Sequence, residues 1–326
     1  MKALQFLGDS RCAVNEVDVP RIEDDEVLLA SRSVGICHSD IELLSGRYII
    51  PFSYPVIPGH EWAAEVVQAG RKVTRFAPGD RVVGECVIGA EHFGFSSSGA
   101  AAEFFVAKEP WLHRLPDNLN WTQGALVEPF SCGYYATVRA DNLDASDTVV
   151  VLAAGPIGLG VVAAAAGKGA RVVVAEPQAD RGALALSLGA EAVVDPADPD
   201  LAEAIGEHTA GQPASVVFEA SGKPAAMAAA LEVAGFRARC VYIGIDVGGK
   251  APAALGLIQS KELQIRGSIG SPGVWPQTLR FLARAKVDLT PLVTKSFALA
   301  DGADAIGAVR HDKTQIKVHV TSLATL

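Results

Sequence analysis

Short apolar segments separated by turn residues fill the first 130 residues of the chain. Pro-Gly, Pro-Gly-Asp and glycine-rich stretches lie between them, which is typical of connections between strands. Strand-like runs occur at residues 27–30, 63–67, 81–83 and 102–106. The pattern predicts an antiparallel or barrel-like, β-rich domain over residues 1–130.

The pattern changes from about residue 131, where short buried strands alternate with helical segments. Strands are expected at residues 149–152, 171–176, 193–194, 215–219, 240–244 and 263–266, and helices at 159–168 and 180–189. Such alternation is typical of βαβ units around a parallel sheet, so we expect an α/β domain over residues 131–269. A helix at 279–285 and a late strand at 316–320 predict that residues 270–326 return to the first domain.

Length, charge and cysteine content narrow the class of protein. A chain of 326 residues suggests two domains, because single cores stop growing at roughly 250–300 residues. The formal net charge of −9 argues against a nucleic acid or an anionic membrane as partner. The N-terminus lacks a secretory signal, and no apolar run approaches the roughly 20 residues that span a bilayer. Five dispersed cysteines without a Cys-x-x-Cys pair favour a reducing cytoplasm.

The turn after the strand at 149–152 is a candidate nucleotide site. It reads Ala153-Ala154-Gly155-Pro156-Ile157-Gly158, a Gly-x-Gly-x-x-Gly pattern with alanine in the first glycine position. Gly155 allows the backbone to approach a pyrophosphate, and Gly158 allows close packing of helix on strand. The helix start offers free N–H groups and a positive dipole. The alternative is an Ala/Gly-rich turn that binds nothing.

An acidic residue at the end of the next strand supports the nucleotide interpretation. Glu176 follows Gly158 by 18 residues and can accept hydrogen bonds from both ribose hydroxyls. A carboxylate there repels a 2′-phosphate, so NAD is favoured over NADP. Arg181 is a further candidate near the adenosine ribose, although a solvated arginine at a helix start is the preferred interpretation.

Two segments of the first domain carry metal-ligand chemistry, at residues 35–40 and 58–62. A catalytic zinc takes three protein ligands and keeps one position open. Cys37 and His60 provide two of them, and Glu61 and Glu128 compete for the third. Each residue also has an ordinary structural role: a buried thiol, a core histidine or a helix cap. The ligand hypothesis therefore depends on their combination.

Geometry limits how these ligands can meet. Adjacent residues of an extended segment point to opposite faces, so His60 and Glu61 can share one ion only if the backbone turns at Pro58-Gly59. Asp40 is the expected acceptor for the far nitrogen of His60, which would fix the tautomer of the imidazole.

These motifs, in this order along the chain, resemble those of the zinc-dependent medium-chain dehydrogenases. The adjacent His60-Glu61 together with Glu128-Pro129 is similar to the polyol, sorbitol and threonine dehydrogenase branch. Residues 54–62, 218–222 and 266–270 also resemble cyclitol and aminocyclitol dehydrogenases, including 2-deoxy-scyllo-inosamine dehydrogenases. The matching segments are residues 35–40, 59–61, 78–82, 128–129, 155–158, 218–222, 265–268 and 316–318.

The resemblance implies a β-rich GroES-like catalytic domain joined to a Rossmann doubly wound parallel sheet. It implies a single zinc held by Cys37, His60 and Glu61, with Glu128 as a direct or water-mediated fourth ligand. Ser39 would carry the proton released from a secondary alcohol (polyol, cyclitol or amino-alcohol), and the hydride would pass to NAD. The resemblance also implies assembly as a homodimer or homotetramer.

Three departures from the family pattern stand out. Residues 85–102 hold one cysteine, Cys86, where most relatives have four, so no structural zinc is expected. Glu42 occupies the place of a proton-relay histidine, which leaves the route of proton exit open. Ala153 replaces a glycine of the nucleotide turn.

Two other functions remain open from the sequence. One is a zinc-free quinone or enoyl reductase, which would lack the ligand set. The other is a non-catalytic nucleotide-binding protein on a dehydrogenase fold. Trp62, Phe93 and Phe95 are candidates for lining a substrate pocket, and packing in the core or a loop is their alternative role.

Overall fold

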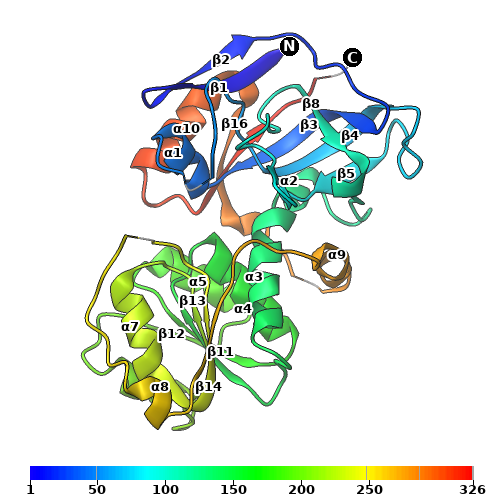
Figure 1. Cartoon of the computed structure of the whole chain (residues 1–326). Coiled ribbons are helices and arrows are strands. Elements are labelled where there is room, and N and C mark those ends of the chain that lie inside the picture. The colour runs from blue at the N-terminus through cyan, green and yellow to red at the C-terminus, as the bar shows by residue number, and fades with distance from the viewer. Residues whose placement is uncertain (49, 247, 286, 325–326) are drawn as a thin grey trace. The chain divides into compact units, whose positions relative to one another are not determined.

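The computed structural model describes every residue except 49, 247, 286 and 325–326 (Figure 1). The described residues form two units, of which the first joins Met1–Glu128 to Trp275–Leu326 and the second is Pro129–Val274. The sequence suggested divisions after residues 130 and 269. The late segment of the chain thus belongs to the same unit as its beginning.

A mixed sheet forms the centre of the first unit. Through the described part of the chain its order is β16-β17-β3-β4-β5-β9, and β8 also pairs with β3. Its pairs are antiparallel apart from the parallel pair β16–β17. The strands are β3 (Glu26–Ile36), β4 (Glu61–Ala69), β5 (Arg81–Gly84), β8 (Phe104–Lys108), β9 (Leu112–Arg114), β16 (Val293–Ala298) and β17 (Lys317–Thr321).

Smaller elements complete this unit. An antiparallel hairpin of β1 (Lys2–Gly8) and β2 (Arg11–Glu16) opens the chain, and a short one of β6 (Val87–Ile88) and β7 (Glu91–His92) lies in the shortened segment. Its helices are α1 (His38–Leu44), α2 (Trp121–Ala125), α9 (Trp275–Arg284) and α10 (Gly302–His311), with 3-10 turns at Glu109–Trp111, Thr290–Leu292 and Leu299–Asp301.

Large aromatic and aliphatic side chains fill the core of the first unit. Trp62 packs edge-on against Phe105, with ring centroids 4.9 Å apart, and Phe93 lies 5.6 Å from Phe105. All three are buried. Burying a side chain of this size contributes about 1.5–3 kcal/mol. Trp62 and Phe93 therefore pack in the core, the structural role that the sequence also offered for them.

The second unit is a parallel sheet covered by helices. Over the residues that the structure describes, the strand order is β12-β11-β10-β13-β14-β15, and every pair is parallel. This is the doubly wound Rossmann order, which confirms the predicted α/β class. The strands are β10 (Thr148–Leu152), β11 (Arg171–Ala175), β12 (Ala192–Val194), β13 (Ala214–Glu219), β14 (Ala234–Tyr242) and β15 (Gln264–Gly267).

Glycine and alanine let the helices of this unit lie close together. Helix α3 (Val127–Arg139) begins at the end of the first unit and continues into the second. A Cβ atom on its Gly133 would lie 2.7 Å from the backbone of Gly160 in α4 (Pro156–Gly167), so only glycine fits there. The remaining helices are α5 (Ala179–Ser187), α6 (Leu201–His208), α7 (Pro224–Val233) and α8 (Leu257–Ser260). No helix in the described ranges is long and apolar enough to cross a membrane.

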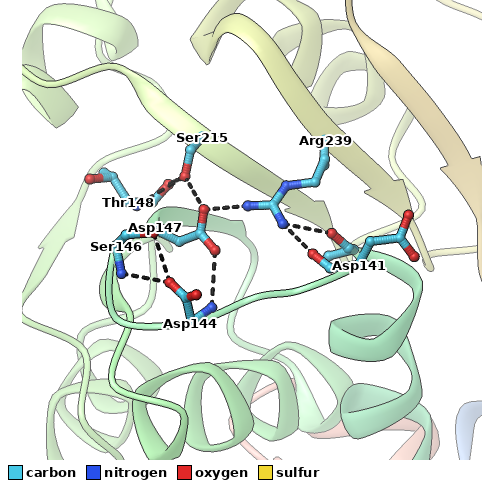
Figure 2. A network of polar contacts seen from close by, with 8 residues as sticks. Asp141, Asp144, Ser146, Asp147, Thr148, Ser215 and Arg239 are labelled. Carbon is cyan, nitrogen blue, oxygen red and sulfur yellow. Dashed lines mark hydrogen bonds and ion pairs between the residues drawn. The ribbon is translucent and has the colours of Figure 1, made fainter.

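A polar network around the buried carboxylate of Asp147 fixes the carboxyl end of α3 (Figure 2). Arg239 of β14 donates to the carbonyl oxygens of Ala140, at 2.9 Å, and Asp141, and it pairs with buried Asp147. Ser215 donates its hydroxyl to the same Asp147 carboxylate at 2.7 Å. The last carbonyl groups of a helix have no partner within it, so the guanidinium group caps this end. Removing one partner of such a buried pair costs about 3–5 kcal/mol.

Candidate active site

Three chemically different ligand groups meet in the first unit. One ligand atom each from Cys37, His60 and Glu61 lies within 4.8 Å of the other two. Cys37 caps the amino end of α1, His60 directly precedes β4, and Glu61 begins that strand. Residue Gly35 of β3 pairs with Glu61 of β4, which brings the end of β3 and the start of β4 side by side.

Two glycines make room for this cluster. A Cβ on Gly35 would lie 2.2 Å from Oε2 of Glu61, so the carboxylate occupies the space that a side chain would take. Gly59 has φ +99°, a conformation that favours glycine, and a Cβ there would lie 2.8 Å from Val34. The backbone therefore turns at Gly59, as the sequence required for His60 and Glu61 to meet.

Asp40 connects two members of the cluster. Its Oδ2 accepts a hydrogen bond from the backbone N–H of Cys37 at 2.8 Å, and its Oδ1 lies 3.5 Å from Nδ1 of His60. Burial lowers the pKa of His60, but the Asp40 carboxylate and Cys37 raise it more, so the pKa lies above its ordinary value. The same negative field favours a cation bound among these groups.

Glu61 forms an ion pair that the sequence did not reveal. Its Oε1 accepts from Nζ of Lys317 in β17 at 2.6 Å, and both side chains are almost fully buried. Burial lowers the pKa of Lys317, whereas Glu61 raises it, and the net pKa is raised. The other oxygen, Oε2, is buried and has no hydrogen-bond partner among the described residues. One oxygen is thus held by an ammonium group, and the second is available to a ligand.

Glu128 lies in the first turn of α3, outside the three-residue cluster. Its Oε1 accepts a hydrogen bond from Sγ of Cys86 at 3.3 Å. Burial raises the pKa of Glu128. Of the two glutamates that competed as third ligand, Glu61 is therefore the one that the structure places with Cys37 and His60.

The residues of the expected proton route lie on α1. Oγ of Ser39 is buried and has no hydrogen-bond partner in the part of the chain that the structure describes. Glu42 accepts two hydrogen bonds of 3.2 Å from Arg47 and lies 3.7 Å from Nε2 of His38. The hydrogen bond from Arg47 lowers the pKa of Glu42. Glu42 is thus held as a carboxylate, which weakens it as a proton acceptor.

The nucleotide turn of the second unit has the expected form. Gly155 is the N-cap of α4, Pro156 and Ile157 begin the helix, and a Cβ on Gly155 would meet no atom within 4 Å. A Cβ on Gly158 would lie 2.0 Å from the carbonyl oxygen of Ala153, so Gly158 is required for the turn to close. Ala153 has φ +83°, a conformation that strains a residue with a Cβ.

Glu176 lies directly after β11 and is fixed by the backbone. Its Oε2 accepts from the N–H of Ala154 at 2.7 Å, and its Oε1 accepts from the N–H of Gln178 at 2.9 Å. A hydrogen bond therefore joins Glu176 to the nucleotide turn. Arg181 lies in the first turn of α5. It is partly buried, whereas the sequence favoured a solvated side chain.

Models of two protein families match separate parts of the chain. Residues 156–284 match the zinc-binding dehydrogenases, and residues 23–117 match the alcohol dehydrogenase GroES-like domain. The chain belongs to the zinc-binding dehydrogenase family. The β-rich unit of this dehydrogenase contains the GroES-like domain, which confirms the second part of the predicted fold class.

Relatives support this membership over nearly the whole chain. D-arabitol-phosphate dehydrogenase of Enterococcus avium is 31% identical over 98% of this dehydrogenase and 96% of its own length. The crystal structure of 2R,3R-butanediol dehydrogenase from Bacillus subtilis superposes with a TM-score of 0.89 at 31% identity, over 98% and 99% of the two chains. A Sinorhizobium meliloti 1021 protein bound to NADP has a TM-score of 0.91 at 27% identity, over 98% and 99%.

The enzyme class follows from these matches. The chain is an oxidoreductase that acts on CH–OH groups of secondary alcohols, which confirms the class predicted from the sequence. Sequence reasoning missed Lys317 and Cys86 as neighbours of the cluster. A charged residue inside the otherwise apolar strand Ile316-Lys317-Val318 was a signal for a buried partner. No local signal pointed to Cys86.

The strain at Ala153 leads to a stability prediction. Replacing Ala153 by glycine (Ala153→Gly) should raise the free energy of unfolding by about 1 kcal/mol, because glycine adopts φ +83° without a steric cost. Its neighbour Ala154 has no positive φ and serves as the control: Ala154→Gly should lower stability by about 0.5–1 kcal/mol. Urea unfolding of both variants measures the difference. A less stable Ala153→Gly variant would show that the turn is not strained.

Proposed function

We propose that this dehydrogenase oxidises a secondary alcohol of the polyol, cyclitol or amino-alcohol type with NAD, at a single zinc bound by Cys37, His60 and Glu61. The observation that carries the proposal is the cluster of their ligand atoms within 4.8 Å. Thiolate, imidazole and carboxylate form a donor set that suits zinc, and three protein ligands leave one position open for a substrate. Glu128, just beyond the cluster, is proposed as a direct or water-mediated fourth ligand.

The cluster fits a divalent cation on independent grounds. Oε2 of Glu61 is buried without a hydrogen-bond partner among the described residues, and burial of such an atom is costly unless something binds it. The space that holds this carboxylate exists because residue 35 is glycine. When bound, zinc acts as a Lewis acid that lowers the pKa of the substrate hydroxyl.

Residues around the cluster orient the ligands. Oδ1 of Asp40 lies 3.5 Å from Nδ1 of His60, where it can orient the imidazole. Lys317 holds one oxygen of Glu61 and keeps the other directed to the cluster. These contacts restrict the ligands before any substrate arrives, which is the condition for efficient positioning.

Ser39 is proposed to accept the proton of the substrate hydroxyl. Its buried Oγ has no partner among the described residues and can therefore exchange a hydrogen bond with a bound alcohol. Glu42 lies one turn further along α1, where Arg47 stabilises its carboxylate form. Glu42 is proposed to pass the proton beyond Ser39, although its lowered pKa makes it a poor acceptor.

The cofactor choice rests on Glu176. Backbone N–H groups of residues 154 and 178 hold its two oxygens at the end of β11, so the carboxylate stays in place. A fixed negative charge there accepts hydrogen bonds from ribose hydroxyls and repels a 2′-phosphate. Gly155, Pro156, Ile157 and Gly158 would receive the pyrophosphate at the start of α4. The hydride transfer itself belongs to the nicotinamide.

The rival functions agree less well with these observations. A zinc-free reductase would not need a cluster of Cys37, His60 and Glu61. A non-catalytic binding protein would not need a buried Ser39 hydroxyl that has no hydrogen-bond partner among the described residues. A single zinc per chain is proposed because the segment at 85–102 contains one cysteine. A homodimer or homotetramer in the cytoplasm remains a prediction from the sequence.

Zinc content and activity of a ligand variant test the metal proposal together. The wild-type enzyme should contain about one zinc per chain and reduce NAD with polyols. Cys37→Ser should retain less than half an equivalent of zinc and lose roughly a hundredfold or more of kcat/KM. Cys12→Ser, in β2, is the matched control and should change neither value. Wild-type enzyme with less than half an equivalent, or full activity of Cys37→Ser, would overturn the proposal.

The cofactor proposal makes a separate prediction. The kcat/KM for NAD should exceed that for NADP by roughly a hundredfold or more, because apposed like charges cost several kcal/mol. Glu176→Ala should reduce this ratio by removing the charge. Absorbance of the reduced nicotinamide at matched substrate concentration gives both values. A preference for NADP, the cofactor bound in the similar S. meliloti structure, would refute the role of Glu176.

A further inference from the structure

A row of three aromatic rings runs from Tyr48 through Phe95 to the proposed metal ligand His60. The rings of Tyr48 and Phe95 are nearly parallel, with centroids 4.5 Å apart and an interplanar angle of 12°. Phe95 lies in turn 4.6 Å from the imidazole of His60. Phe95 is buried and belongs to the shortened segment at 85–102. This segment therefore supplies a ring that fixes Tyr48 next to the cluster.

The phenol group of Tyr48 differs in its hydrogen bonding from the phenols of two other tyrosines. It makes no hydrogen bond with any residue that the structure describes, and the residue is half-buried. Two other tyrosines differ: the hydroxyl of Tyr54 donates to the carbonyl of Leu43 at 2.5 Å, and that of Tyr242 donates to Met227 at 2.9 Å. A phenol hydroxyl can both donate and accept a hydrogen bond, so that of Tyr48 is available to a bound ligand.

The surroundings of Tyr48 are those of the proposed catalytic cluster. Burial raises the pKa of Tyr48, and the neighbouring acidic groups of Cys37, Cys86, Asp40 and Glu128 raise it further. The group is therefore a neutral phenol at physiological pH, able both to donate and to accept a hydrogen bond. Its acidic neighbours include Cys37, a proposed metal ligand, so Tyr48 lies close to the cluster.

We infer that Tyr48 is a specificity-determining residue whose phenol hydrogen-bonds a second hydroxyl of the substrate. The inference rests on the proposed function, in which the reacting oxygen is bound at the metal cluster. The phenol, separated from His60 by the ring of Phe95, meets a different part of the same molecule. A site that hydrogen-bonds a hydroxyl group discriminates strongly against the analogue that lacks it. Tyr48 thus selects diols and polyols over monohydric alcohols.

A pair of substrates that differ by one hydroxyl tests this inference. The ratio of kcat/KM for 2,3-butanediol to that for 2-butanol is measured in the wild type and in Tyr48→Phe. The phenylalanine keeps the ring that stacks on Phe95, so folding and the melting temperature should not change. We expect Tyr48→Phe to lose roughly tenfold on the diol and less than twofold on 2-butanol. D-arabitol with NAD extends the comparison to a longer polyol.

Tyr54→Phe is the matched control, since it removes a phenol that already has a backbone partner. It should leave the substrate ratio unchanged, although it lowers the melting temperature. An unaltered ratio in Tyr48→Phe, or equal losses on both alcohols, would overturn the inference while wild-type activity and the proposed function remain. Wild-type enzyme that oxidises no alcohol of the set would instead refute the proposed function, and the inference with it.

Discussion

Buried negative charge is the constraint on which this centre depends. Asp40, Glu61 and Glu128 are all buried, and the thiol of Cys37 lies beside them. Lys317 compensates one carboxylate through a 2.6 Å ion pair. Two like charges 4 Å apart repel by about 4 kcal/mol at an effective dielectric constant near 20. A divalent cation bound among the ligand atoms would reduce this repulsion. Protonation of the same groups would reduce it as well and would compete with binding of the cation.

The backbone is shaped around this charge by residues without bulk. Gly35 leaves the space that the Glu61 carboxylate fills, and Gly59 lets the chain turn so that consecutive residues reach one point. The nucleotide turn follows the same rule, since Gly158 closes against a carbonyl oxygen and Gly155 faces open space. Ala153 is the exception, because it carries a Cβ at φ +83°, a conformation that favours glycine. In both units, therefore, the proposed binding site depends on glycines, which leave space that a side chain would fill.

Much of the fold was predictable because its signals are local. Buried strands such as residues 149–152, and the glycine turn that follows, carry their pattern within a few residues. The hairpin of β1 and β2 gave no such signal, since its residues form neither a long apolar run nor a clear alternation. Helix α3 was likewise missed, because its apolar positions sit between two predicted domains.

The site was predictable only in part, for a physical reason. Cys37 and His60 carry recognisable ligand chemistry, but the choice between Glu61 and Glu128 depends on the pairing of Gly35 with Glu61 across two strands. The partner of Glu61 lies 256 residues away along the chain, at Lys317. Tyr48 reaches the centre through Phe95, a contact that no spacing in the sequence encodes.

X-ray absorption at the zinc K edge of the purified enzyme tests the central claim most directly. Binding by Cys37, His60 and Glu61 predicts one sulfur neighbour at about 2.3 Å, with nitrogen and oxygen neighbours at about 2.0–2.2 Å. That shell would place a single thiolate, an imidazole and a carboxylate on the metal. A shell with two or more sulfur atoms, or with none, would contradict the proposed centre.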